Sequence, residues 1–233
     1  MSKKVSIPAT DGSGSFDAYV AVPEMAPAPA LVVIQEIFGV NKVMRDMCDY
    51  LANEGFIAIC PDLFWRQRPG VDITDQTEEE WKQAFALFQG FDVDKGVEDL
   101  KATLDAIRKH PEGTGKAGTV GFCLGGKLAY LMATRSDADC NIAYYGVGIN
   151  ELLDESKNIK KPLLMHIAEK DQFVPPDAQA QIAAGLKDNA LVEMHTYPGV
   201  DHAFARKSGK TYNADAAHLA FERTDEFLNK NLA

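Results

Sequence analysis

Short apolar runs alternate with segments of helical spacing along most of the chain. The continuous apolar runs 30–38 and 56–64 are typical of strands that are buried on both faces of a sheet. The segment 16–24 instead alternates apolar and polar side chains, as a strand with one exposed face does. The same reasoning predicts strands at 117–123, 141–148, 161–171 and 191–198, and helices at 41–55, 78–90, 93–111, 124–136, 175–188 and 213–232.

This order of elements predicts an α/β protein with a mainly parallel central sheet and helices on both faces. The chain of 233 residues fits within one large domain. We find no repeat, no low-complexity tract and no linker long enough to separate two domains. We therefore expect a single domain over residues 1–233.

Composition and charge narrow the range of partners. With 46% hydrophobic and 25% charged residues, the composition is that of a globular protein. The formal net charge of −10 argues against nucleic acid and anionic membranes, which select basic surfaces. No segment approaches the roughly 18 apolar residues of a membrane span, and no apolar run follows the N-terminal lysines as in a signal peptide. We expect a cytoplasmic monomer whose partner is a small molecule.

The four cysteines are too sparse for a disulfide scaffold, and none forms a CxxC pair. This usage fits a reducing compartment. Cys48, Cys60 and Cys140 lie in helical or strand patterns, where we expect inert buried thiols. Cys123 differs from them in its surroundings.

Cys123 lies at the centre of the sequence GFCLG, between a predicted strand and a predicted helix. The pattern Gly-x-nucleophile-x-Gly in this context is that of a nucleophile elbow, whose glycines avoid collisions with neighbouring backbone. A helix N-terminus next to the thiol favours negative charge and offers N–H groups to an oxyanion. Cys123 is therefore a candidate nucleophile, although a buried, unreactive cysteine in a glycine-rich turn is the alternative.

A nucleophile of this kind needs a base and an acid that orients the base. Among five histidines, His202 follows the last predicted strand in a loop, whereas the others lie in helical or strand patterns. Asp171 lies where an earlier strand becomes a loop, with Glu169 and Asp177 as competing carboxylates. The order Cys123, Asp171, His202 matches the nucleophile–acid–base order of α/β-hydrolases.

Glu36 is a charged residue within the otherwise largely apolar run 30–38. A carboxylate at the end of a buried strand is costly unless it has a partner or a chemical task. One role is chemical, and the other is a simple ion pair with an arginine such as Arg206. The sequence leaves both open.

With these residues identified, the chain resembles the dienelactone hydrolases, a branch of the α/β-hydrolase fold that uses a cysteine nucleophile. The matching stretches follow the family order along nearly the whole chain. They are QEIFGVN (35–41), CPDLF (60–64), GFCLGG (121–126), YYGVG (144–148), DQFVP (171–175) and HAFAR (202–206).

The resemblance implies hydrolysis of a lactone or ester, such as the opening of a dienelactone to maleylacetate, through an acyl-enzyme on Cys123. It further implies that Glu36 takes the thiol proton when substrate binds, so that the resting thiol is neutral. The backbone N–H groups of Leu124 and Ile37 would hold the oxyanion. His202, oriented by Asp171, would assist protonation of the leaving group and deacylation.

The chain departs from the family in its expected contacts to the substrate. The best-studied members of the family bind a substrate carboxylate with two arginines, of which Arg206 matches one. At the position of the second arginine this chain has Trp81, and Phe85 replaces a tyrosine. These aromatic residues suit a neutral or bulkier acyl group, or they merely pack their helix. Phe38 and Tyr145 are further candidates for contact with the substrate.

Three functional hypotheses follow, and none requires a cofactor. The first is a dienelactone hydrolase, the second a broad short-chain carboxylesterase or thioesterase acting on neutral esters, and the third a non-catalytic ligand binder or thiol sensor. A non-catalytic protein would be expected to have lost at least one of Cys123, Asp171 and His202. All three residues are present, which argues against the third hypothesis. Histidine and cysteine spacings match no metal motif, and the glycines match neither GxGxxG nor GxxxxGK[ST], so we predict no metal and no nucleotide.

Overall fold

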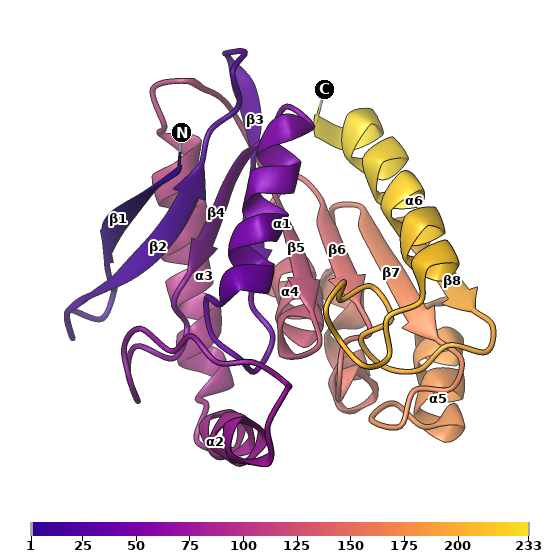
Figure 1. The fold of residues 1–233 in the computed structure, drawn as a ribbon. Coiled ribbons are helices and arrows are strands. Elements are labelled where there is room, and N and C mark those ends of the chain that lie inside the picture. Colours follow the sequence, from indigo (N-terminus) through magenta and orange to yellow (C-terminus); the bar gives the residue numbers. More distant parts are fainter. Residues whose placement is uncertain (1, 233) are drawn as a thin grey trace. The chain divides into compact units, whose positions relative to one another are not determined.

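The structure is a computed structural model that describes residues 2–232, and the chain divides into two compact units. The units are Met1–Gly118 and Thr119–Ala233, and Figure 1 shows the elements of each. This division does not test the expected single domain over residues 1–233, which stays a prediction.

The first unit is built on strands in the order β1-β2-β4-β3. β1 pairs with β2 and β2 with β4 in antiparallel fashion, whereas β3 and β4 are parallel. The side chains of β4 are all buried and those of β3 nearly so, as their continuous apolar sequences predict. The bounds are β1 (Ser2–Pro8), β2 (Ser15–Ala21), β3 (Ala28–Ile34) and β4 (Ile57–Pro61).

Two features of this unit differ from the sequence prediction. β1 was not predicted, because only Val5 and Ile7 alternate with polar side chains in a segment that carries two lysines. Its pairing with β2, which sets Ile7 opposite Phe16, makes it an edge strand, and lysines are common on such edges. β3 ends at Ile34, so Glu36 lies in the loop after the strand rather than within it.

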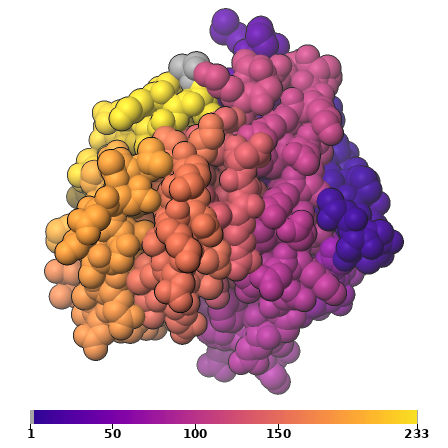
Figure 2. Space-filling view, turned by 180° about the vertical axis from the view of Figure 1, so that it is seen from behind, coloured from indigo at the N-terminus to yellow at the C-terminus, as the bar shows by residue number. Residues whose placement is uncertain are grey.

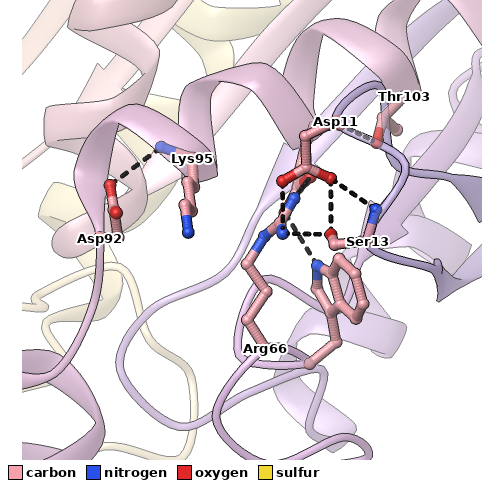
Figure 3. Close-up of polar contacts among 8 residues, drawn as sticks. Asp11, Ser13, Arg66, Asp92, Lys95 and Thr103 are labelled. Carbon is pink, nitrogen blue, oxygen red and sulfur yellow. Dashed lines mark hydrogen bonds and ion pairs between the residues drawn. The ribbon is translucent and has the colours of Figure 1, made fainter.

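The helices of the first unit begin at side chains that accept a backbone hydrogen bond. The side chains of Asn41, Thr77 and Asp92 accept the N–H of the residue three positions later. Figure 3 shows the pair Asp92 and Lys95. In Figure 1, α1 and α3 lie on opposite sides of the strands of this unit. The bounds are α1 (Lys42–Asn53), α2 (Glu78–Gln89) and α3 (Val93–Arg108).

Arg66 connects three segments of the first unit through its guanidinium group (Figure 3). It donates to both oxygens of the buried Asp99 on α3, at 3.1 and 2.7 Å. It also donates to Asp11 at 2.9 Å and to the Ser13 hydroxyl at 2.6 Å, both in the turn between β1 and β2. Asp99 accepts a further hydrogen bond from the Trp65 indole at 2.8 Å. The segment after β4 is thereby fixed to α3 and to the turn.

The second unit is built on parallel strands in the order β5-β6-β7-β8. In Figure 1, α6 lies on one side of these strands and α4 on the other. Strand β5 begins before the division between the units and ends within the second. The bounds are β5 (Gly113–Phe122), β6 (Asn141–Tyr144), β7 (Leu163–Ala168), β8 (Val192–Tyr197), α4 (Leu124–Arg135), α5 (Pro176–Leu186) and α6 (Ala214–Leu232).

A 3₁₀ helix, η1 (Ile149–Asn158), follows β6 and was not predicted. Its sequence is mostly polar and buries only Ile149 fully, and its three apolar residues (Ile149, Leu152 and Leu153) are few for the prediction of a helix. It packs beside α5, where Leu153 approaches Gly185, and Figure 2 shows the two segments next to each other on the surface.

The parallel arrangement of the second unit places three strand ends at one edge of its sheet. Cys123 follows β5, Asp171 comes shortly after β7, and His202 comes shortly after β8. The candidate residues are therefore gathered by topology. Within residues 2–232, every helix is too short or too polar to cross a membrane.

Candidate active site

Cys123 occupies the turn between β5 and α4 in a backbone conformation that is rare for residues with a side chain. Its φ is 58° and its ψ is −114°. A Cβ atom on Gly121 would lie 1.9 Å from the carbonyl oxygen of Gly125, so Gly121 must lack a side chain. Strain of this kind persists where the surrounding structure enforces it, and it is typical of a nucleophile elbow.

Cys123 is the only partly exposed cysteine among the four, since Cys48, Cys60 and Cys140 are buried as expected. Its own N–H donates to the Tyr144 carbonyl at 3.1 Å. Leu124 begins α4, and the first N–H groups of a helix have no partner within it. The thiol therefore sits at a positive helix end with donors nearby.

Asp171 and His202 form a buried pair in the same unit. The Nδ1 atom of His202 lies 2.9 Å from Oδ2 of Asp171, and the two residues are 6% and 4% exposed. The other oxygen of Asp171 accepts the N–H groups of Phe173 at 2.8 Å and Val174 at 3.1 Å. These bonds fix the carboxylate in the orientation that meets the imidazole.

The competing carboxylates are engaged elsewhere. Glu169 is exposed and accepts the N–H of Gly199 at 2.8 Å. Asp177 is exposed in the first turn of α5, where a negative charge favours the helix. Of the three carboxylates considered from the sequence, Asp171 is the one hydrogen-bonded to His202.

The pKa of His202 is raised from 6.5 to about 10 despite burial. Burial alone lowers this pKa, but the nearby negative charge of Cys123 and the hydrogen bond and charge of Asp171 more than offset it. Among the described residues, Nε2 of His202 forms no well-aligned hydrogen bond. Together, Cys123 and Asp171 therefore favour the protonated form of the imidazole.

Two aromatic rings flank the imidazole of His202. Tyr145 meets it at a centroid distance of 5.0 Å and Phe173 at 4.9 Å, with steep interplanar angles of 63° and 77°. Tyr145 has a φ of 38°, and its N–H donates to the His166 carbonyl at 2.8 Å. Phe173 lies within the matching stretch DQFVP but was not among the residues predicted to contact the site. Its ring is 37% exposed, which is unusual for a phenylalanine and was not visible in the sequence pattern.

The backbone around His202 is held from the following loop. Ala203 has a φ of 61°, and its carbonyl accepts the N–H of Arg206 at 2.9 Å. The Thr211 hydroxyl donates to the His202 carbonyl at 2.5 Å. Arg206 is buried, at 8% exposed, in the same unit as Cys123.

Glu36, Ile37 and Phe38 lie together in the first unit, in the loop after β3, and all three are buried. Gly39 follows with a φ of 77°, and a Cβ there would lie 2.0 Å from the Val71 carbonyl oxygen. Gln35 precedes them and accepts the N–H of Leu63 at 3.1 Å. The loop is therefore fixed at both ends.

Phe38 belongs to an aromatic group with two residues of α2. It meets Trp81 at a centroid distance of 5.1 Å, and Trp81 stacks on Phe85 at 5.4 Å. The indole N–H of Trp81 donates to the Asp75 carbonyl at 2.9 Å. Phe85 is 40% exposed, so the group presents an apolar surface. The indole N–H of Trp81 is the one polar hydrogen on these three side chains, and it is already hydrogen-bonded to Asp75.

The candidate residues thus fall into two sets. The second unit holds Cys123, Leu124, Tyr145, Asp171, His202 and Arg206, whereas the first unit holds Glu36, Ile37, Phe38, Trp81 and Phe85. Within residues 2–232, no group of three or more histidine, cysteine or acidic side chains has an arrangement that could hold a metal ion.

Comparisons with known proteins point to one family. Residues 16–232 match the sequence model described as "Dienelactone hydrolase family". A protein named "Putative carboxymethylenebutenolidase" from Azospirillum brasilense is 54% identical over 233 residues, which cover 98% of each chain. A protein named "Carboxymethylenebutenolidase" from Pseudomonas putida is 42% identical over 98% of this chain and 96% of its own.

A similar structure has been solved by crystallography. A protein from Klebsiella pneumoniae named "Putative Dienelactone Hydrolase" has a TM-score of 0.84 and 28% sequence identity, and the match covers 96% of each chain. This likeness confirms the predicted α/β-hydrolase fold class.

Proposed function

Because the chain is a lactone or ester hydrolase of the dienelactone hydrolase family, we propose that it acts through an acyl-enzyme on Cys123. One observation carries the proposal. Cys123 projects from a strained strand-to-helix turn, and the same unit holds a buried Asp171–His202 pair that follows two neighbouring parallel strands. A nucleophile, a base and an orienting acid are the parts that acyl transfer requires.

The chemistry follows from these parts. The thiolate of Cys123 attacks the carbonyl carbon, and the N–H of Leu124 at the start of α4 stabilises the oxyanion. The imidazolium of His202 gives its proton to the leaving oxygen as the C–O bond breaks, which leaves a thioester on Cys123. His202 then takes a proton from water, the hydroxide attacks the thioester carbonyl, the C–S bond breaks with Cys123 leaving as the thiolate, and the acid product departs. Asp171 holds the imidazole in one tautomer throughout.

The origin of the thiolate has two explanations. The family resemblance assigns proton removal to Glu36 on substrate binding, with Ile37 as the second oxyanion donor. The alternative is that His202 takes the thiol proton itself, which gives a thiolate–imidazolium pair before substrate arrives. Glu36→Ala separates them: a large loss of kcat/KM with the fold intact supports the role of Glu36, and unchanged activity supports the resting pair.

The proposal is tested with a chromogenic ester and the variants Cys123→Ala and His202→Gln. We expect turnover by the parent chain and loss of at least about 10³-fold in kcat/KM for each variant, since removing one member of such a set disables the chemistry. Equal turnover by Cys123→Ala would overturn the proposal. No turnover by any form, together with ligand binding, would support the non-catalytic hypothesis.

The aromatic group of Phe38, Trp81 and Phe85 favours a second candidate, a carboxylesterase or thioesterase for neutral substrates. A dienelactone carries a carboxylate, and losing one charged contact costs about 1.5–3 kcal/mol of anion binding. Trp81 supplies no charge, which leaves Arg206 as the proposed anchor. The ratio of kcat/KM for an anionic dienelactone to kcat/KM for a neutral ester decides between the two candidate functions. A ratio well above one supports a dienelactone hydrolase, and a ratio well below one supports a hydrolase of neutral esters. Tyr145 is proposed as a further contact to the substrate.

Cytoplasmic location, a monomeric state and a small-molecule partner stay predictions. They are consistent with the acidic composition. Sedimentation of the purified chain tests the monomer.

A further inference from the structure

Two loops of the second unit carry the acid and the base. We call residues 169–175, after β7, the acid loop, and residues 198–206, after β8, the base loop. Each loop contributes one carboxylate to the backbone of the other. These carboxylates belong to Asp201 and Glu169.

Asp201 in the base loop binds the acid loop and its own neighbour at once. Its Oδ1 atom accepts the N–H of Gln172 at 3.0 Å and the N–H of His202 at 2.6 Å. Its Oδ2 atom lies 3.2 Å from the Gln172 side-chain nitrogen, which donates to it. Charged acceptors form the stronger hydrogen bonds in proteins.

Glu169 in the acid loop makes the reciprocal contact. Its Oε2 atom accepts the N–H of Gly199 at 2.8 Å, where a φ of 72° suits a glycine. The N–H of Lys170 also donates to the Val200 carbonyl at 2.8 Å, so this end of the two loops is joined by backbone as well. Glu169 is therefore the less critical of the two carboxylates.

The bonds of Asp201 and Asp171 close a ring of four residues. Asp171 is followed by Gln172, and Asp201 is followed by His202. Asp171 bonds the His202 side chain, while Asp201 bonds the Gln172 backbone and the His202 backbone. Rotation or sliding of one loop against the other must break at least one of these bonds.

We propose that Asp201, supported by Glu169, is a positioning residue that holds the acid loop and the base loop in the register that the Asp171–His202 bond needs. The inference rests on the proposed roles of Asp171 and His202. Both carboxylates bond to the backbone of the two loops, so neither is assigned a chemical step.

The first test compares steady-state kinetics of Asp201→Ala, Asp201→Asn and the matched control Asp188→Asn, which alters an exposed acidic residue of the same unit. We expect Asp201→Ala to lower kcat by about 10–100-fold with KM nearly unchanged, because small misplacements of catalytic groups are costly. Asp201→Asn keeps an acceptor oxygen and should recover most of the rate. The control should match the parent chain.

The second test measures the titration of the His202 ring by NMR, with His202→Gln to assign the signal. Cys123 and Asp171 are the titratable groups that raise this pKa. In Asp201→Ala we expect the pKa to fall from about 10 towards 6.5, because the Asp171 bond lengthens. A merely structural role would lower thermal stability and leave this pKa unchanged, and that result would overturn the inference. Should Asp201→Ala fail to fold, the same two readouts apply to Asp201→Ser, which also lacks the carboxylate that bonds Gln172, and parent values in that variant would also overturn the inference.

The titration separates this inference from the proposed function. A parent chain without ester turnover contradicts the proposed function, whereas the His202 pKa still reports whether Asp201 orders the two loops.

Discussion

Replacing Cys123 by alanine should lower the pKa of His202. In the intact site this pKa rises from 6.5 to about 10, which corresponds to roughly 5 kcal/mol in favour of the imidazolium. Burial acts against that rise, and the charge of Cys123 is the largest contribution that supports it. An opposite charge at close range is worth about 1–3 pKa units, so we expect a fall of about that size in Cys123→Ala.

The assay is NMR titration of the His202 ring, with Cys123→Ser as the matched variant that keeps a polar group but not an acidic thiol. Serine should behave like alanine, since its hydroxyl stays neutral over the titration. A pKa that stays near 10 in both variants would refute the reasoning, because the charge of Cys123 would then not govern the imidazole.

The same titration has a consequence for stability. A histidine whose folded pKa lies above its unfolded value contributes stability that is fully present below pH 6.5. That contribution is lost as the pH rises from 6.5 through about 10. The difference in unfolding free energy between the parent chain and Cys123→Ala, measured with urea, should therefore shrink towards pH 10. A difference that grows with pH would contradict this sign.

Three further predictions test other parts of the structure. Gly121→Ala should cost about 2–4 kcal/mol of stability in urea unfolding, because its Cβ would collide with the Gly125 carbonyl; parent stability would contradict the elbow geometry. Arg66→Ala should cost about 3 kcal/mol, since it leaves the buried Asp99 carboxylate without its ion pair, and Arg66→Ala combined with Asp99→Asn should recover part of that loss. Phe173→Ala should lower kcat by about 10-fold, because the His202 ring loses a neighbour that restricts its motion, and Phe173→Leu should lower kcat less. A kcat equal to that of the parent chain in both variants would show that Phe173 does not position His202.

Most of the fold, and the main candidate residues of the second unit, could be predicted from the sequence. Apolar runs and helical spacing predicted the buried strands and the principal helices, because those elements bury continuous or periodic apolar surface. The GFCLG pattern located Cys123 because a strained turn with close backbone approach requires glycines at fixed positions. Chain order then placed Asp171 and His202 at neighbouring strand ends.

What the sequence missed depends on contacts between distant segments. β1 forms through its pairing with β2, and η1 is a mostly polar segment that buries only Ile149 fully. The bonds from Asp201 to Gln172 and from Glu169 to Gly199 join loops about 30 residues apart, so no local pattern reveals them. Glu169 was a reasonable candidate for the acid until the structure showed which backbone N–H it binds.

The central claim is that Cys123 becomes acylated during turnover, and mass spectrometry of the rapidly quenched enzyme tests it most directly. With a chromogenic acetate ester, the peptide that contains Cys123 should gain one acetyl group, and the adduct should be longer-lived in Asp171→Asn, where deacylation slows. Turnover with no acyl group on that peptide, or with the group on another residue, would contradict the mechanism proposed for this chain.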